Sequence, residues 1–141
     1  MNMNKKQKYI NPIIVVAALI IKDSKVLITK RSTGDEIVFG KWEFPGGKVE
    51  QSENEFHAIE REIEEELEIK IKAKEFIINN ICEYPNKIVD LRLYECDYIS
   101  GNFKLHDHSK FAWVNINDLL NYDLALADIP LAKYIIDKNK N

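Results

Sequence analysis

The hydrophobic and polar positions of this chain alternate in a way that predicts several strands around one amphipathic helix. Two runs rich in β-branched residues, separated by Lys22-Asp-Ser, predict a hairpin. Thr33 to Phe39 predicts a loop, and Pro45-Gly46-Gly47 ends the short extended segment before it. The predicted strands are Pro12–Ile21, Lys25–Arg31, Trp42–Phe44, Glu75–Cys82, Ile88–Tyr98 and Phe111–Val114, with a turn over Ile99-Ser-Gly-Asn.

The amphipathic helix follows the glycines. Phe56, Ile59, Ile63 and Leu67 recur at the spacing of one helix face, which predicts a core-facing stripe. Ser52 and Glu55 have the Ser-x-x-Glu spacing of a capping box, with Ser52 as N-cap, so the helix is expected to begin near Glu53.

Two further helices are expected near the C-terminus. Asn117 or Asp118 predicts the start of a brief helix. Asp128-Ile-Pro places a proline in a first helical turn, where its missing N–H is harmless, and Leu131–Ile136 continues that helix. These elements predict an α/β sandwich with a mixed sheet. We expect residues 1–141 to form a single domain, with residues 1–8 as a flexible N-terminal tail.

Charge is unevenly distributed along the chain. The formal net charge is −3 over 141 residues, yet residues 50–68 hold nine glutamates and a single basic residue, Arg61. Glu62, Glu65 and Glu66 fall within one helical arc about 100° wide. Like charges four residues apart destabilise a helix by about 0.2–0.5 kcal/mol per pair, so a compensating cation is expected. Mg²⁺ suits this face because it takes oxygen ligands and is completed by substrate phosphates.

Other features exclude several classes of partner. No Lys/Arg run or recognisable nucleic-acid motif is present, so we predict no nucleic-acid partner. The apolar run Ile13–Ile21 is too short to span a bilayer and lacks a cleavage site, so it predicts a buried strand and no membrane partner. Cys82 and Cys96 predict free thiols, and we expect a cytoplasmic protein. The pattern does not predict an oligomeric state.

The glutamate pattern resembles the Nudix box. The chain matches the box at Gly47, Glu53, Arg61, Glu62, Ile63, Glu65, Glu66 and Ile69. One position departs from it, because Glu68 stands where the family has glycine. Either Glu68 adopts the left-handed conformation that ends a helix, at a cost of about 1 kcal/mol, or the turn closes differently. The preceding segment, Gly40 to Gly47, is similar to the MutT branch of the family. The resemblance implies a Nudix-type α/β/α sandwich with a central mixed β-sheet, the box helix and a C-terminal helix.

The resemblance also implies roles for the box residues. Glu62, Glu65 and Glu66 would bind Mg²⁺, or Mn²⁺ as a substitute, together with the carbonyl of Gly46. Glu53 would be a supporting carboxylate, and Arg61 would orient a glutamate by a charge-assisted hydrogen bond. Either Glu62 or Glu65 would deprotonate the attacking water. Asp107 stands where MutT-like enzymes carry an additional metal-binding carboxylate; its neighbours His106 and His108 are assigned no role.

The remaining assignments concern the substrate. By the same resemblance, Arg31 and Lys48 would contact phosphate. Leu124 to Pro130 is similar to the base-reading segment of MutT-like and CTP-pyrophosphohydrolase-like enzymes, which makes Asp128 the candidate for base recognition. Its alternative is an N-cap of the last helix. Phe44, and with it Tyr84, would flank a base.

The predicted function is hydrolysis of a (deoxy)nucleoside triphosphate to monophosphate and pyrophosphate, with 8-oxo-dGTP as the favoured substrate, in nucleotide-pool sanitising. The main alternative is a pyrimidine triphosphate such as CTP or dCTP, suggested by Asp128. A second alternative is a non-catalytic, nucleotide-binding regulatory Nudix domain, which commonly loses box glutamates. A third is cleavage of ADP-ribose, a dinucleotide or a pyrophosphorylated sugar, for which the sequence offers no supporting motif.

Overall fold

The computed structural model describes residues 11–140, so the predicted tail over residues 1–8 lies outside the described residues. Within this range the chain forms seven strands, two α-helices and two short 3₁₀ helices. In order they are β1 (Ile13–Lys22), β2 (Lys25–Arg31), β3 (Trp42–Glu43), β4 (Gly46–Lys48), α2 (Glu55–Leu67), β5 (Lys70–Tyr84), β6 (Lys87–Ser100), β7 (His108–Asn115), η1 (Ile116–Asn121), η2 (Leu126–Asp128) and α3 (Ile129–Asn139).

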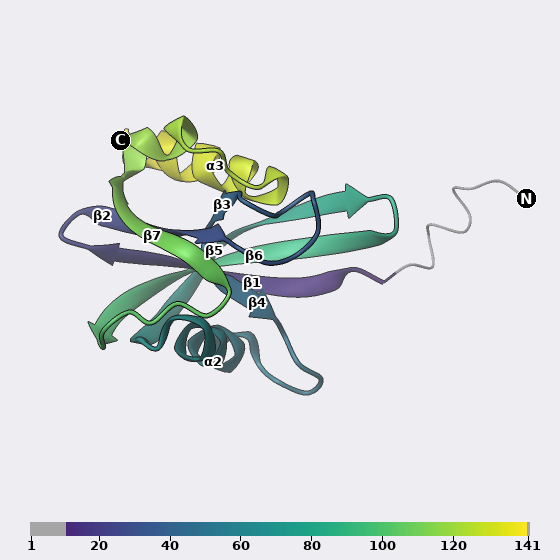
Figure 1. Cartoon of the computed structure of the whole chain (residues 1–141), viewed down its shortest axis with the longest axis horizontal. Coiled ribbons are helices and arrows are strands. Elements are labelled where there is room, and N and C mark those ends of the chain that lie inside the picture. The colour runs from purple at the N-terminus through teal and green to yellow at the C-terminus, as the bar shows by residue number, and fades with distance from the viewer. Residues whose placement is uncertain (1–10, 141) are drawn as a thin grey trace, which may run out of the picture.

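The strands form one mixed sheet. Its central order is β3-β2-β1-β6-β5, with β4 paired to β1 and β7 paired to β2. β1 and β6 run parallel, whereas the other pairs are antiparallel. α2 lies on one side of the sheet and α3 on the other (Figure 1). The predicted α/β/α sandwich is therefore confirmed. No helix among residues 11–140 is long and apolar enough to cross a membrane.

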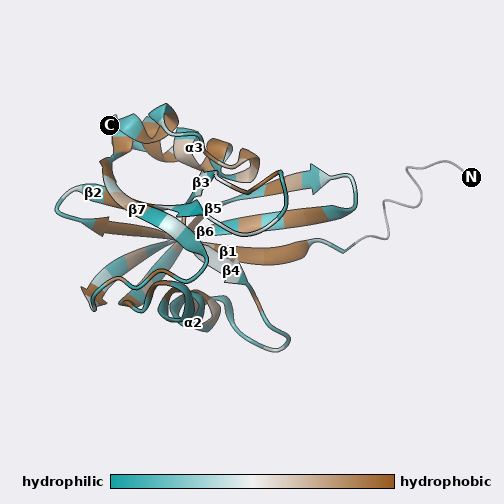
Figure 2. Ribbon diagram, in the orientation of Figure 1, coloured by the Kyte–Doolittle hydropathy of each residue, from teal (hydrophilic) through white to brown (hydrophobic). Residues whose placement is uncertain are grey.

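β1 lies between the two hydrophobic cores of the protein, one on each face of the sheet. Val16, Ala18 and Ile20 pack toward α2, while Ala17 and Leu19 pack toward α3. Figure 2 shows hydrophobic colour over most of β1, between the two helices. A strand buried on both faces needs no polar alternation, which is why this segment is an almost continuous apolar run.

The N-terminus of α2 differs from the prediction. The N-cap is Asn54, whose side chain accepts a hydrogen bond from His57 N at 2.7 Å, so the helix begins at Glu55. Ser52 lies outside the helix in a left-handed conformation, with φ 65°. The predicted capping box of Ser52 and Glu55 is therefore wrong. Glu55, expected to cap, instead accepts from Arg92 and Tyr94 on the sheet.

This correction yields a stability prediction. Asn54→Ala should lower the free energy of unfolding by about 1 kcal/mol, because one N–H of the first helical turn loses its partner. Ser52→Ala should leave it nearly unchanged. Urea unfolding of both variants measures the difference. Equal losses at the two positions would contradict the cap at Asn54.

The C-terminus of α2 agrees with the first of the two predicted alternatives. Glu68 adopts the left-handed conformation (φ 55°, ψ 35°), and its N–H donates to the carbonyl of Glu64. His106 binds the Glu68 carboxylate with Nε2, 2.6 Å away, and its backbone N–H donates to the Glu66 carbonyl. The segment before β7 therefore closes the end of the helix although the family's glycine is absent.

Several strand boundaries differ from the prediction. β5 begins at Lys70, not Glu75, because Ile71 and Ala73 point inward between exposed lysines and pair with β6. β6 continues through Ile99 and Ser100, into the expected turn. Gly46 and Gly47, expected only to break the chain, form β4 beside β1. Long-range pairing extends these strands past the limits that local residue types indicate.

Candidate active site

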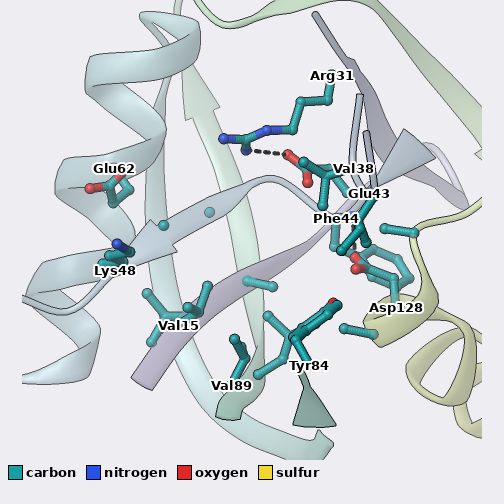
Figure 3. A pocket seen from close by; sticks show the side chains of 18 of the residues that line it. Val15, Arg31, Val38, Glu43, Phe44, Lys48, Glu62, Tyr84, Val89 and Asp128 are labelled. Atoms are coloured by element: carbon teal, nitrogen blue, oxygen red, sulfur yellow. Dashed lines mark hydrogen bonds and ion pairs between the residues drawn. The ribbon is translucent and has the colours of Figure 1, made fainter. Parts of the chain in front are cut away.

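A cavity of about 390 Å³ lies between α2 and the segment that leads into α3. Glu62 and Glu66 of α2 line it, and so do Phe44 and Asp128. Figure 3 shows Glu62 and Lys48 at one side of the cavity and Asp128 near Tyr84 at the other. The fold therefore brings two of the predicted carboxylates, Glu62 and Glu66, and the predicted base-reading residue to one cavity.

The glycines of β4 allow the sheet and helix to approach each other beside this cavity. A Cβ on Gly46 would lie 1.8 Å from the carbonyl oxygen of Val16, and one on Gly47 would lie 2.1 Å from Oε2 of Glu62. No larger residue fits at either position without moving β1 or the Glu62 carboxylate. The Gly-Gly pair thus sets the position of Glu62 relative to β4.

Arg61 connects the box carboxylates. Its Nε and Nη2 donate to Glu53 at 2.7 and 3.0 Å, and its Nη1 donates to Glu62 at 2.9 Å and to Glu65 at 3.0 Å. Nη2 also donates to the carbonyl of Lys48 at 3.2 Å. The hydrogen bonds to Glu53 and, after them, the contact with Glu62 raise the pKa of Arg61 well above its usual value. The guanidinium therefore fixes carboxylates of α2 and the preceding loop in one arrangement.

Glu53 supports Arg61 from the loop before α2. Hydrogen bonds from Arg61 and from the backbone N–H of Glu50 lower the pKa of Glu53 to about 2. His57 adds a contact of 2.8 Å between its Nδ1 and Oε2 of Glu53. Glu53 does not line the cavity, and its role as a supporting carboxylate stays a prediction.

Two polar residues of this region carry no assignment from the sequence. His108, at the start of β7, has a fully buried side chain whose Nε2 lies 2.9 Å from Oε2 of Glu43. Glu43 lines the cavity and also accepts from Arg31 at 3.4 Å. Neither residue belongs to a recognisable sequence motif. The only signal in the sequence is that each is a polar residue within a strand.

Burial changes the acidity of the carboxylates on α2. Desolvation raises the pKa of Glu62, against the opposing effect of Arg61. The pKa of Glu66 rises to about 7, chiefly through burial and further through the charges of Asp107 and Glu62, while His108 opposes the rise. Without a cation, a large fraction of Glu66 therefore keeps its proton up to neutral pH.

This shift predicts a pH effect on stability. The folded pKa of Glu66 lies above its ordinary 4.5, so its ionisation destabilises the metal-free fold as pH rises through about 7. Glu66→Gln imitates the protonated form. In EDTA, the variant should melt above the wild type at pH 8 and close to it at pH 5. Thermal melts at both pH values test this; a constant difference across the range would contradict it.

The residues at the cavity fit a bound magnesium ion. Oε2 of Glu66 is buried and has no hydrogen-bond partner, and the absent Cβ of Gly47 leaves room for the Glu62 carboxylate beside it. Among residues 11–140, no three acidic, histidine or cysteine side chains converge closely enough to hold a metal ion by themselves. Carboxylate oxygens are ligands that Mg²⁺ takes, and water and substrate phosphates usually complete its coordination.

Two predicted metal ligands do not line the cavity. Glu65 is 58% exposed and binds Arg61. Asp107 is half-buried, and its carbonyl accepts from the backbone N–H of Ser32. Both lie close to residues that line the cavity. Glu65 shares Arg61 with Glu62, and Asp107 is near enough to Glu66 for its charge to raise the pKa of Glu66. Their metal roles stay predictions.

The predicted phosphate contacts lie at the cavity. Arg31 ends β2, donates to Glu43 and to the carbonyl of Thr33, and lines the cavity (Figure 3). Lys48 ends β4, and its exposed side chain lines the same cavity. Two cations therefore stand near the α2 carboxylates, where a polyphosphate would meet them.

Asp128 lies at the other side of the cavity. The residue is 5% exposed, and its Oδ2 accepts from the backbone N–H of Phe44 at 2.9 Å. Asp128 precedes α3 but makes no capping hydrogen bond with its side chain, so the alternative as a side-chain cap is wrong. Burial raises its pKa well above the usual range, and the Glu43 charge adds to the rise. A carboxyl that is held neutral in this way can donate a hydrogen bond as well as accept one.

Comparison with known proteins agrees with this arrangement. The Nudix domain model matches residues 12–135. The chain therefore belongs to the Nudix family, and the resemblance read from the glutamate pattern is confirmed.

Individual relatives align with most of this chain. A CTP pyrophosphohydrolase of Escherichia coli (strain K12) is 37% identical over 83% of this chain and 86% of its own. An 8-oxo-dGTP diphosphatase of Buchnera aphidicola subsp. Schizaphis graminum is 32% identical over 79% of this chain and 82% of its own. The solution structure of the E. coli ORF135 protein superposes with a TM-score of 0.84 at 33% identity and covers 94% of both chains.

Proposed function

We propose that this Nudix hydrolase cleaves (deoxy)nucleoside triphosphates to nucleoside monophosphate and pyrophosphate. The observation that carries the proposal is the shared cavity, which is lined by Glu62 and Glu66 of α2, by Arg31 and by Asp128. Glu62 and Asp128 lie at opposite sides of it (Figure 3). A nucleotide placed there would have its phosphates beside the carboxylates and cations and its base beside Phe44 and Asp128.

The chemistry needs an oxygen nucleophile and neutralisation of charge that develops on phosphate. A bound Mg²⁺ would supply positive charge to the phosphate oxygens and lower the pKa of a coordinated water. Glu62 and Glu66 would hold it, with Glu65, Asp107 and the Gly46 carbonyl as the further predicted ligands. Mn²⁺ would substitute for it. Either Glu62 or Glu65 would accept the proton of the attacking water.

Arg61 would act on the carboxylates and not on the substrate. Its three hydrogen-bonded carboxylates leave it turned away from the phosphates, and it does not line the cavity. Arg31 and Lys48 would hold the phosphates and keep the scissile bond in place.

Among triphosphates, 8-oxo-dGTP is the proposed substrate, with CTP or dCTP as the alternative. The relative named 8-oxo-dGTP diphosphatase supports the first and the relative named CTP pyrophosphohydrolase supports the second. Asp128 is compatible with both, because one oxygen is held by Phe44 and the other, which the raised pKa of the carboxyl favours in the protonated form, can accept from or donate to the edge of a base. We place this activity in the cytoplasm, where free nucleotides occur.

The test is a screen of ordinary and oxidised triphosphates and of nucleoside diphosphate conjugates in Mg²⁺, with products identified. Monophosphate and pyrophosphate are expected. Release of orthophosphate, or turnover of ADP-ribose alone, would contradict the proposal. Tight nucleotide binding without turnover would favour the non-catalytic regulatory alternative.

A further inference from the structure

His108 is a buried polar residue that contacts both sides of the proposed site without lining the cavity. It opens β7 opposite Arg31 of β2, where the pairing of the two strands is irregular. Its side chain is 0% exposed. A buried imidazole is uncommon unless its nitrogens have partners, so the surroundings of each nitrogen indicate what the residue does.

The Nε2 atom of His108 contacts the side of the site where the substrate phosphates would bind. It lies 2.9 Å from Oε2 of Glu43, and because a carboxylate accepts hydrogen bonds, Nε2 is the donor. The same oxygen accepts from Nη1 of Arg31 at 3.4 Å. Arg31 is the cation at the end of β2 that lines the cavity. The position of this guanidinium therefore depends on a carboxylate that His108 orients.

The Nδ1 atom faces the metal side. It lies 3.6 Å from Oε2 of Glu66, and both atoms are buried without a hydrogen-bond partner among the described residues. Two unpartnered polar atoms that face each other would be costly in a purely structural core. A small shift of the Glu66 side chain toward a ligand in the cavity would change this separation directly.

We propose that His108 is a positioning residue for the hydrolysis, which ties Glu66 to Arg31 through Glu43. The imidazole keeps the metal-binding carboxylate and the phosphate-binding guanidinium at a fixed separation. The inference rests on the proposed function, because it requires that Glu66 contact the cation and Arg31 the triphosphate. It adds a residue that touches neither, and whose partners come from β3, α2 and β2.

The two nitrogens can be tested separately. Asparagine places an amide near the Nδ1 position, and glutamine places one near the Nε2 position. His108→Gln should therefore keep the bond to Glu43, and His108→Asn the polar contact toward Glu66. His108→Leu removes both at similar volume. His106→Gln is the matched control, because His106 is exposed, lies in the same segment and binds Glu68 outside the cavity.

The measurements are the dissociation constant of Mn²⁺ by electron paramagnetic resonance without nucleotide, the KM for the preferred triphosphate, and the melting temperature. His108→Leu should weaken Mn²⁺ binding and kcat/KM by about 10- to 100-fold, the usual loss for a group that orients a metal ligand. His108→Gln should weaken Mn²⁺ binding with little change in KM, and His108→Asn should raise KM with little change in Mn²⁺ binding. His106→Gln should match the wild type.

Wild-type Mn²⁺ affinity and KM in folded His108→Leu would overturn the inference. If that variant does not fold, the comparison of His108→Gln with His108→Asn decides: identical Mn²⁺ constants and identical KM values in the two would overturn it. A wild type that neither binds Mn²⁺ nor cleaves a triphosphate would instead overturn the proposed function itself, so the two failures are distinguishable.

Discussion

Glu62→Gln should lower kcat/KM for the preferred triphosphate by about 10²-fold or more without unfolding the protein. Glu62 lines the cavity, is held by Arg61 and lies against Gly47, so its carboxylate is placed to contact a cation. Removing one negative charge from this site weakens the binding of the cation, and the charge on the phosphates is then neutralised less well. Glutamine keeps the size of the side chain and its hydrogen bond from Arg61.

Glu64→Gln is the control for this prediction. Glu64 lies on the same helix, is exposed and does not line the cavity, so its neutralisation should leave turnover near that of the wild type. The melting temperature of Glu62→Gln should equal or exceed the wild-type value, because burial already disfavours its charge and like-charge repulsion falls. Turnover and thermal melts with and without Mg²⁺ measure both. Wild-type turnover in folded Glu62→Gln would remove Glu62 from the site.

The second large effect is expected at Asp128. Asp128→Ala leaves the buried N–H of Phe44 without a partner, which lowers the stability of the fold. It also removes the group proposed to face the base, which should weaken transition-state binding by about 1–3 kcal/mol. That corresponds to about a 5- to 150-fold loss in kcat/KM, on top of a lower melting temperature. The loss should depend on the base, since the phosphates are held by other residues.

Asp128→Asn separates the two roles. Its carbonyl oxygen can still accept from Phe44 N–H, so stability should stay near that of the wild type. Its NH₂ group can only donate, whereas the carboxyl oxygen at that place can also accept. Preference among 8-oxo-dGTP, dGTP and CTP should therefore shift, with Mg²⁺ dependence unchanged. Rates measured on all three nucleotides test this. Equal losses on every base would show that Asp128 serves only to anchor Phe44.

Local pattern was enough to predict much of this fold. Ile59, Ile63 and Leu67 of the predicted stripe repeat with the helical period and share one buried face. Phe56, predicted as the fourth member, is 48% exposed, because it lies in the first turn of the helix. The run from Ile13 to Ile21 similarly predicts a strand buried on both faces. The N-cap was missed by two positions because Ser52 and Asn54 are both capping residues. The structure shows that Asn54 caps the helix and that Glu53, which lies before it, binds Arg61.

The candidate site divides in the same way. By itself, the sequence determined the box helix, the spacing of its glutamates and the glycines before it, because these depend on neighbours along the chain. Only the tertiary structure decided that Asp128 binds Phe44, 84 residues away, and that His108 binds Glu43, 65 residues away. No local period encodes such pairs. They form because the sheet and its two covering helices bury these polar groups, and a buried polar group is stable only beside a partner.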